Sequence, residues 1–485
     1  MIEDQIRIHD KFSVEIKLGF IARKKQPISD FAVNTWIFIP HSLNIDRETY
    51  DKTDFYRDLK SNIRLITPVF PLCDIASAGN APFSLLVKSF REIGLFPNAA
   101  NISAYEYHIR MFVSIVKSAL RAEINQIVSN GNLKATDSLI DSYIENISQI
   151  LREYRNLGRS INVPAISKAI FNYYLFGDEF LSNLIEQHSF RLMEDIGKTM
   201  GLSTVSRAKL MNIITEEIEY KRLKGFPVVE KESSNNNRDL VFRLTLLKKY
   251  AENELFLNTN KRRDGIWTEQ VYLSIAAGIS MIFATVIAFS FQQKFGNFTM
   301  PFFVAIIVGY MLKDRIKELL RYYYAHRLSR RFFDHRTDVS LSGHNIGWSK
   351  ESMDFIPEIK VPPDVIRIRN RSDILEAENR NNREKIILYR RLIRLNRKNL
   401  DECSEYPVNG INDVIRFNIS HYILKMDNPS IPLYIPDDER GIGIVRGEKM
   451  YYLNLLFQFR SEGQTNYKRY RIVLNREGIR EIENF

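Results

Sequence analysis

The stretch VYLSIAAGISMIFATVIAFSF, residues 271–291, contains twenty-one residues and no charged side chain. A helix needs about 20 apolar residues to cross a hydrocarbon core of about 30 Å. After the six residues QQKFGN, a second uncharged run of fifteen residues follows at 298–312. This shorter run can still span if the helix continues to Lys313 and Lys317, whose stems can be buried while their ammonium groups reach water. The two runs predict a transmembrane hairpin with helices at about 271–291 and 298–313, because a buried hairpin of a soluble protein usually keeps a polar stripe on its outer face.

The charges that flank these runs predict the orientation of the hairpin. Lys and Arg are concentrated before and after it, whereas the connecting segment holds only Lys294. Because positive residues favour the cytoplasmic side, we expect a multi-pass protein of the cytoplasmic (inner) membrane with both termini in the cytoplasm. The formal net charge of +11 also suits a lipid bilayer with anionic headgroups as a partner. The residues expected to contact these headgroups are Lys261, Arg262, Arg263, Lys313, Arg315, Lys317 and Arg321.

Small residues recur at every fourth position within the two uncharged runs. Such spacing lets helix backbones approach closely. We expect these residues to pack the two helices of the hairpin on each other. The alternative is that the same face drives association into a homo-oligomer. The residues are Ala276, Ser280, Ala284 and Ala288 in the first run and Ala305 and Gly309 in the second.

Outside the hairpin, the patterns predict soluble regions of mixed structure. The expected fold class is α+β cytoplasmic domains with a central two-helix transmembrane hairpin, a helical bundle in the N-terminal half and a β-rich C-terminal domain. The expected boundaries are an N-terminal α+β sheet region at 1–80, the bundle at 81–230, a membrane module with flanking cytoplasmic helices at 239–335, and a C-terminal α+β domain at 350–485.

Periodicity and turn residues predict individual elements within these regions. The apolar spacing of residues 412–426 fits a helix, and the segment from 441 to the end reads as a β-meander with a hairpin turn in SEGQTN, 461–466. The helices expected in the bundle, with start and stop signals at their ends, are 103–129, 135–157, 164–196 and 203–224.

No sequence motif assigns a catalytic, cofactor or metal site. His335, with Asp334 and Asp338, comes nearest to a metal-binding group, but the neighbouring arginines favour an ion-paired helix end. The glycines of GIGIVRG, 441–447, lack the spacing of a phosphate loop and favour turns or bulges. Stretches such as YKRYRIVLNR are typical of a solvated sheet face, so nucleic acid is not expected as a partner.

Three functions remain open at this stage. The leading hypothesis is a bacterial, membrane-anchored and non-enzymatic assembly or sensor protein, whose large cytoplasmic domains bind an unidentified protein or ligand. Cys73 and Cys403 fit this location as free thiols in a reducing cytosol. An oligomeric channel or membrane-disrupting effector gated by the cytoplasmic domains is the first alternative, although the runs lack the ionisable residues that mark an ion pathway. A membrane-tethered enzyme acting on a nucleotide or lipid headgroup is the second, because a fold alone can assemble a catalytic site.

Overall fold

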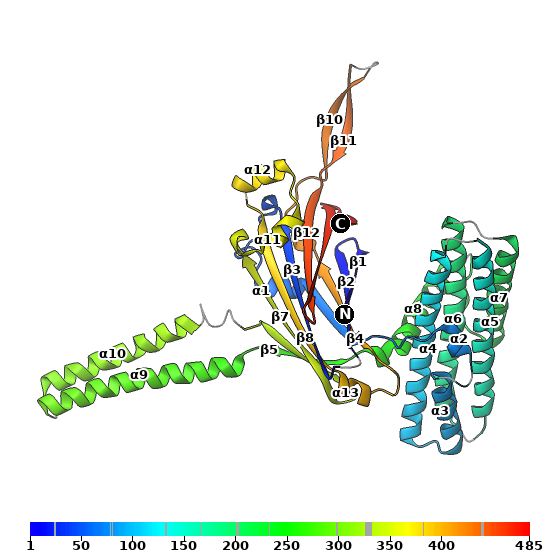
Figure 1. Cartoon of the computed structure of the whole chain (residues 1–485), viewed down its shortest axis with the longest axis horizontal. Helices are drawn as coiled ribbons and strands as arrows, with labels where there is room; N and C mark the ends of the chain where they lie inside the picture. Colours follow the sequence, from blue (N-terminus) through cyan, green and yellow to red (C-terminus); the bar gives the residue numbers. More distant parts are fainter. Residues whose placement is uncertain are drawn as a thin grey trace. The chain divides into compact units, whose positions relative to one another are not determined.

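The computed structural model describes all residues of the chain except 24, 25, 78, 80, 131, 132, 165, 200–202, 232, 297, 298, 325–331, 382 and 438–440. Its described part is a mixture of helices and strands. The chain folds into two compact units, whose elements are labelled in Figure 1. The sheet unit consists of Met1–Ile63, Asn258–Cys403 and Gly410–Phe485, and the bundle unit consists of Arg64–Leu257 and Ser404–Asn409.

The sheet unit contains two large sheets and several short helices. The eight-stranded sheet has the order β14 (Gly478–Asn484), β13 (Gln464–Asn475), β12 (Tyr451–Ser461), β3 (Ile28–Ile39), β8 (Lys385–Asn396), β7 (His344–Ile356), β6 (His335–Leu341) and β5 (Asn258–Arg263). The four-stranded sheet has the order β1 (Ile2–Asp10), β2 (Ser13–Ile21), β9 (Gly410–Asn418) and β4 (Leu59–Leu65). The short helices are α1 (Lys52–Asp58), α11 (Pro363–Arg369), α12 (Asp373–Asn381), α13 (Arg397–Glu402) and α14 (Ser420–Ile423).

Side chains from both sheets form the main core of this unit. Leu18 of β2, Phe417 of β9 and Ile37 of β3 line one small internal cavity. Because successive residues of a strand point to opposite faces, Phe38 lies on the other side of β3. There it packs in a second core with Val365 of α11. The second half of β3, residues 35–39, is therefore buried on both faces.

The division into units differs from the boundaries expected from the sequence, which separated 1–80 from 350–485. In the larger sheet, β3 of the N-terminal region lies between β8 and β12 of the C-terminal region. Trp36 pairs with Leu388 on one side and with Leu456 on the other. Local periodicity carries no information about strand partners that are far apart in the chain, so the sequence patterns separated regions that share one sheet.

The segment 412–426 differs from its predicted helix. Residues up to Asn418 form β9, which pairs antiparallel with β2, and only α14 is helical. Asp413, Ile415 and Phe417 are buried, as expected for alternate residues on the inner face of a strand. The apolar residues of this segment fit the spacing of a helix, but its β-branched residues also favour a strand. The pairing with β2 decides between the two structures.

The turn predicted in SEGQTN is confirmed. Ser461 of β12 pairs with Gln464 of β13, so the connection has two residues. Glu462 and Gly463 both have positive φ, at 53° and 80°. Two residues in the left-handed region match the right-handed twist of a two-residue hairpin, and the glycine removes the steric cost at its position.

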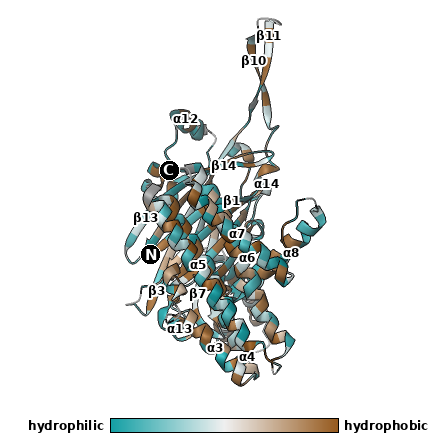
Figure 2. Ribbon diagram, turned by 90° about the vertical axis from the view of Figure 1, so that its right-hand side faces the viewer, coloured by the Kyte–Doolittle hydropathy of each residue, from teal (hydrophilic) through white to brown (hydrophobic). Residues whose placement is uncertain are grey.

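The meander predicted from 441 onwards is confirmed only for β12, β13 and β14, because residues 441–448 belong to a separate two-stranded arm. β10 (Ser430–Asp437) pairs only with β11 (Gly441–Glu448). Leu433 lies opposite Val445 on one face and Tyr434 lies opposite Ile444 on the other. All four side chains are exposed, and Figure 2 shows hydrophobic residues of the arm in brown. The glycines of 441–447 lie within β11, where only Gly441 has a positive φ, at 73°.

The bundle unit confirms the predicted helices to within a few residues at each end. Capping side chains explain two of the starts. Asn98 accepts a hydrogen bond from the Asn101 N–H before the first long helix, and Ser203 accepts one from the Ser206 N–H before the fourth. The helices are α2 (Leu72–Ala76), α3 (Phe83–Leu95), α4 (Ala99–Ser129), α5 (Leu133–Ile161), α6 (Lys168–Thr199), α7 (Thr204–Lys224) and α8 (Ser234–Glu252).

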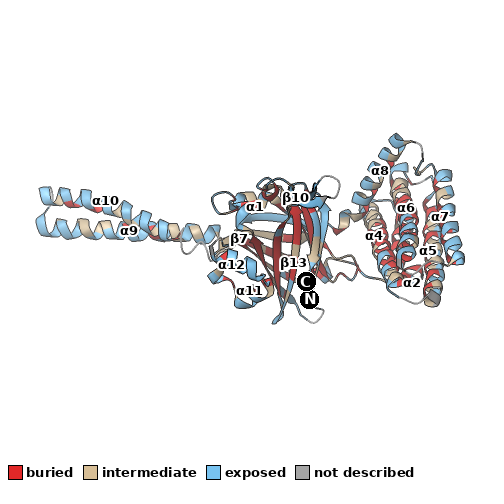
Figure 3. Cartoon of the chain, turned by 90° about the horizontal axis from the view of Figure 1, so that it is seen from above, coloured by how far each residue is buried: buried red, intermediate tan, exposed pale blue. Residues whose placement is uncertain are grey.

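Two long helices complete the sheet unit. α9 (Ile266–Phe295) and α10 (Met300–Tyr323) run side by side and are joined at one end (Figure 1). Coloured by burial, both are mostly exposed along their length (Figure 3). The predicted membrane module 239–335 is thus divided, because α8 belongs to the bundle unit, whereas α9 and α10 belong to the sheet unit.

Candidate functional site

The helices α9 and α10 are inserted between neighbouring strands of the larger sheet. β5 ends at Arg263 and β6 begins at His335, and these two residues are paired in the antiparallel register. The N–H of Asp264 also donates a hydrogen bond of 3.3 Å to the carbonyl oxygen of Asp334. The chain therefore leaves the sheet and rejoins it at the same place.

Within the described part of the chain, α9 is the one helix that is long and apolar enough to cross a membrane. Its apolar side chains are mostly exposed, including Ile282 at 66% and Phe289 at 66%. A soluble protein rarely leaves so much contiguous apolar surface in contact with water. One helix that qualifies by its length and composition is weak evidence for membrane association.

The small residues predicted to pack the helices lie along the contact between α9 and α10. The residues of these two helices that the structure buries are Ala276, Ser280, Ala305 and Gly309. Ala284 and Ala288 are half-buried. A Cβ atom built on Gly309 would lie 3.5 Å from Cγ2 of Ile287 and 3.9 Å from the carbonyl oxygen of Ala284. The backbones thus approach closely at Gly309, as small residues permit.

The alignment of the two helices determines which part of α9 lies beside the basic residues of α10. The rings of Tyr272 and Tyr324 lie 5.0 Å apart at one end of the contact, and Gly309 faces Ile287 further along. Lys313 is one helical turn beyond Gly309, towards Tyr324. It therefore lies beside the apolar middle of α9.

The seven residues predicted to contact anionic lipid fall into two groups. The three that precede α9 are held by carboxylates: Lys261 by Glu351 at 2.6 Å, Arg262 by Asp338 at 2.9 Å and Arg263 by Glu269 at 3.2 Å. Those on α10 have fewer ion pairs: Arg321 lies 3.4 Å from Glu318, Lys313 Nζ lies 3.7 Å from the centre of the Tyr310 ring, and Arg315 and Lys317 are exposed and form no ion pair with the described residues. The α10 group therefore offers the more available positive charge.

Lys261 links the insertion to the interior of the sheet unit. Its partner Glu351 is buried and accepts a hydrogen bond of 2.6 Å from the hydroxyl of Tyr389. Burial alone would raise the pKa of Glu351, but the nearby Arg391 and Lys261 bring that pKa below its usual value. Glu351 is therefore ionised, and its ion pair with Lys261 holds β5, the strand that leads into α9.

The residues considered as a metal-binding group lie beside or on β6, whereas the sequence analysis expected a helix end. Asp334 accepts hydrogen bonds from Lys52 at 2.6 Å and from the Tyr56 hydroxyl at 2.9 Å. Asp338 forms ion pairs with arginines, and His335 pairs within the strand ladder. Strand pairing on both sides overrides the helical pattern in this segment. Among the described residues, no group of three or more His, Cys, Asp or Glu could hold a metal ion.

A second polar cluster lies inside the bundle unit, along one side of α6. Its buried members are Asp178, Glu179, Ser182, Asn183 and Glu186. The basic partners of its carboxylates come from three other helices: Arg155 of α5 binds Asp178, Arg243 of α8 binds Glu179, and Lys221 of α7 binds Glu186.

Arg155 is the centre of this cluster. It donates two hydrogen bonds, of 3.0 and 2.7 Å, to Glu217 of α7. The Tyr220 hydroxyl donates one of 2.6 Å to Asp178. Burial raises the pKa of Asp178, although Arg155 and Tyr220 favour its charged form. Because each carboxylate is paired, the cluster ties α5, α6 and α7 together and offers no unpaired acid for catalysis.

This cluster was not predicted from the sequence. Its signal is present, because Asp178, Ser182 and Glu186 are four residues apart and Glu179 and Asn183 follow the same spacing. A polar stripe of this kind usually indicates a solvated helix face. Only the packing of three other helices against it shows that the stripe is buried.

Comparison with known proteins adds no functional assignment. No protein-family model matches the chain, and neither the curated proteins nor the solved structures contain a significant match.

Proposed function

We propose that the protein is a membrane-anchored, non-enzymatic assembly or sensor protein, in which α9 and α10 form a two-span anchor. The observation that carries this proposal is the pairing of Arg263 with His335 at the two ends of the insertion. If α9 crosses the bilayer, the chain must return to reach His335 on the side where it left Arg263. α10 is the helix that follows α9 within this insertion. Both termini then lie on one side, which the positive flanks make the cytoplasm.

The uncharged part of α10 is shorter than that of α9. Its residues run from Met300 to Leu312 and cover about 20 Å at about 1.5 Å per residue. Because Lys313 lies beside the apolar part of α9, a two-span anchor requires the stems of Lys313 and Lys317 to extend towards the headgroups and the bilayer to be thinner beside α10. Arg315 and Lys317 are exposed and available to anionic lipid.

The hydroxyl groups of α9 favour an anchor over a channel. Ser274, Ser280 and Thr285 each donate a hydrogen bond of 2.8–2.9 Å to a backbone carbonyl of their own helix. Hydroxyls bonded in this way need no water-filled pore in order to be stable in a membrane. The uncharged run of α9 contains no charged residue. A subunit that conducts ions usually carries ionisable residues along its pathway.

Cysteine accessibility tests the two-span topology. Cys73 and Cys403 are replaced by Ser, and single cysteines are introduced as Lys294→Cys, near the joined ends of the helices, and Ile359→Cys, which is 92% exposed in the sheet unit. A membrane-impermeant maleimide is applied to sealed vesicles of known orientation. It should label Lys294→Cys from the side opposite the cytoplasm and Ile359→Cys only from the cytoplasmic side. Labelling of both from the cytoplasmic side alone would rule out a crossing.

We further propose that the anchors associate into a homo-oligomer. Ala284 and Ala288 are only half-buried by α10, so part of the small-residue surface is left for another copy. Light scattering of the protein in nanodiscs gives the number of subunits. An oligomer that becomes monomeric in Ala288→Leu supports this contact, and a monomeric wild type contradicts it.

A further inference from the structure

A cleft of about 580 Å³ lies on the sheet unit, beside the end of β7 and the start of β8. This volume is in the range of small-molecule sites, about 300–1,000 Å³. Phe355, Ile356 and Ile386 provide an apolar part of its lining, and the last two are paired across the strands. The cleft is thus supported by the regular part of the sheet.

The rest of the lining is rich in positive charge. Its basic side chains are Arg47, Lys360, Arg383 and Lys385. Arg47 donates a hydrogen bond of 2.8 Å to the carbonyl oxygen of Phe355. Of the carboxylates that the structure describes, none forms an ion pair with Lys360, Arg383 or Lys385. Lys385 acts electrostatically on Asp46 and Arg383 on Glu358, but no described carboxylate holds either side chain in an ion pair, so both can still donate hydrogen bonds to a ligand.

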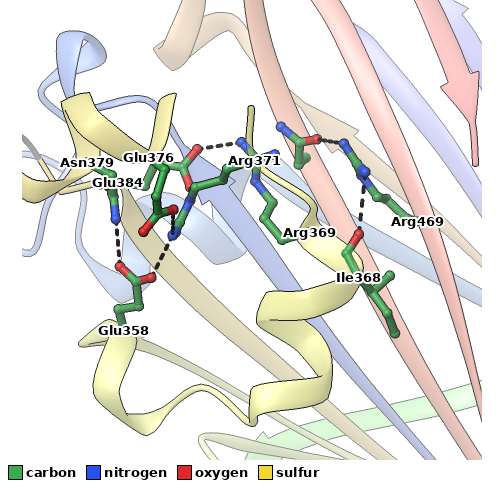
Figure 4. A network of polar contacts seen from close by, with 9 residues as sticks. Glu358, Ile368, Arg369, Arg371, Glu376, Asn379, Glu384 and Arg469 are labelled. Carbon is green, nitrogen blue, oxygen red and sulfur yellow. Dashed lines mark hydrogen bonds and ion pairs between the residues drawn. The ribbon is translucent and has the colours of Figure 1, made fainter. Parts of the chain in front are cut away.

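Two carboxylates of the lining, Glu358 and Glu384, are bonded to arginines that are not part of the lining (Figure 4). Arg371, whose side chain is 3% exposed, donates to Glu358 at 2.6 Å and to Glu384 at 2.9 Å. Arg369 donates to the other oxygen of Glu384 at 2.7 Å, and Asn379 donates to Glu358 at 2.9 Å. These bonds compensate most of the charge of the two acids, although Arg371 also pairs with Glu376 and Arg383 of the lining also acts on Glu358.

A third carboxylate of the lining, that of Asp46, is hydrogen-bonded to the backbone of its own loop. Asp46 accepts hydrogen bonds from the backbone N–H groups of Thr49, at 3.1 Å, and Glu48, at 3.0 Å. These bonds end on Oδ1 of Asp46 and lower its pKa, so this carboxylate keeps its negative charge. The two acidic side chains of the lining that no arginine binds, Asp46 and Glu48, stand against four basic ones. The cleft consequently carries an excess of positive charge next to an apolar wall.

We propose that this cleft binds a small molecule that carries a phosphate monoester or diphosphate group, with its apolar portion against Phe355 and Ile356. Lysine and arginine are the side chains that recognise phosphate oxygens, through charged hydrogen bonds. The phosphate group can belong to a free nucleotide or to a lipid headgroup, since both present the same chemistry. This proposal does not depend on whether α9 crosses a membrane.

Calorimetric titration of the full-length protein in detergent tests the proposal. The probes are ADP and inorganic pyrophosphate for a free phosphate compound, and glycerol 3-phosphate for a lipid headgroup. The wild type is compared with Lys360→Gln/Arg383→Gln and with Lys385→Gln. The matched control is Arg367→Gln, which removes a charge from α11 at a side chain 80% exposed and outside the cleft.

We expect saturable binding that weakens about tenfold for each charged hydrogen bond removed, and no change in Arg367→Gln. Binding of ADP or pyrophosphate identifies a free phosphate compound, whereas binding of glycerol 3-phosphate alone identifies a headgroup. Circular dichroism confirms that each variant is folded, and Lys385→Gln serves if the double variant is not. Equal binding by all variants, or no binding of any of the three probes, would overturn the proposal.

Discussion

Tyr154 of α5 packs against Gly177 of α6, where no side chain larger than hydrogen fits. A Cβ atom on Gly177 would overlap the Tyr154 hydroxyl and lie 2.9 Å from Cγ2 of Ile109. The contact is reciprocal, because Tyr174 of α6 occupies the same kind of space at Gly158 of α5. The two tyrosine rings are stacked, with centroids 5.3 Å apart. The glycines thus set how closely the two helices approach.

Gly177→Ala should therefore destabilise the bundle unit. Overpacking of a dense core costs roughly 1–3 kcal/mol, which exceeds the gain in helix propensity of about 1 kcal/mol. Gly197→Ala in the same helix is the matched control, because nothing lies within 4 Å of its Cβ position and it should be neutral or stabilising. Hydrogen exchange of α5 and α6 peptides measures both. Equal protection in the two variants would show that the close contact does not limit packing.

Arg391 and Asp413 form an ion pair enclosed between the two sheets, with side chains 4% and 1% exposed. Ser61 donates a further hydrogen bond of 2.7 Å to Asp413. Asp413→Asn removes the carboxylate paired with this buried guanidinium and leaves Glu351 as its remaining acidic neighbour, so we expect a loss of roughly 3 kcal/mol. The exposed pair of Arg394 and Asp30 is the control, and Asp30→Asn should cost about 1 kcal/mol or less.

Urea unfolding followed by tryptophan fluorescence compares these two variants, because the chain's tryptophans Trp36, Trp267 and Trp348 all belong to the sheet unit. The double variant Arg391→Met/Asp413→Leu should recover much of the loss, since it removes both charges together. If Asp413→Asn costs no more than Asp30→Asn, burial of the pair is not what makes it important.

Gly309→Leu should separate α9 from α10, whereas Gly309→Ala should be tolerated. The 3.5 Å distance from the Gly309 Cβ position to Ile287 is an ordinary contact for a methyl group, but leaves no room for a larger side chain. Tyr272→Cys/Tyr324→Cys, in a background with Cys73 and Cys403 replaced by Ser, reports the contact through disulfide formation. The yield should fall in Gly309→Leu and remain high in Gly278→Leu, whose Cβ position is open. A high yield in both leucine variants would refute the prediction.

The bundle unit should lose stability as the pH falls. His188 is buried on α6, and desolvation, with the nearby Arg121 and Lys117, lowers its pKa to about 4. The unfolded chain, with a histidine pKa near 6.5, binds the proton at a higher pH than the folded chain. The contribution is therefore fully present above about pH 6.5 and is lost progressively towards pH 4, by roughly 2–3 kcal/mol.

Hydrogen exchange of α6, corrected for the intrinsic rate at each pH, measures this loss. His188→Leu removes the titrating group and should flatten the dependence between pH 6.5 and pH 4. An unchanged slope in this variant would assign the pH dependence to other groups.

The β10–β11 arm should bind hydrophobic dyes. A two-stranded hairpin is marginally stable alone, and this one exposes apolar side chains on both faces, such as Leu433 at 53% and Ile444 at 63%. Leu433→Ser/Ile444→Ser should lower fluorescence of an anilinonaphthalene dye without changing the thermal unfolding of the sheets. Ile359→Ser, at an isolated exposed position, should have a much smaller effect on the dye. Equal effects of the two changes would mean that the arm is not the binding surface.

Elements with a strong local signal were predictable from the sequence. The long bundle helices carry their own periodicity and capping residues, as at Asn98 and Ser203, so their limits follow from nearby residues. The small residues between α9 and α10 could also be found, because their spacing of four reflects the helical repeat. The strand β9 was mistaken for a helix, since its local spacing fits both structures and only its pairing with β2 decides between them.

The sequence by itself determined that α9 is apolar enough for a membrane, that the chain is strongly basic, and where the long helices of the bundle begin and end. These properties depend on residues that are close together in the chain. Only the tertiary structure decided that Arg263 pairs with His335, that β3 lies among C-terminal strands, and that the polar side of α6 is buried. Each of these depends on partners from distant segments, whose approach is set by the packing of the whole unit and leaves no periodic pattern in the sequence.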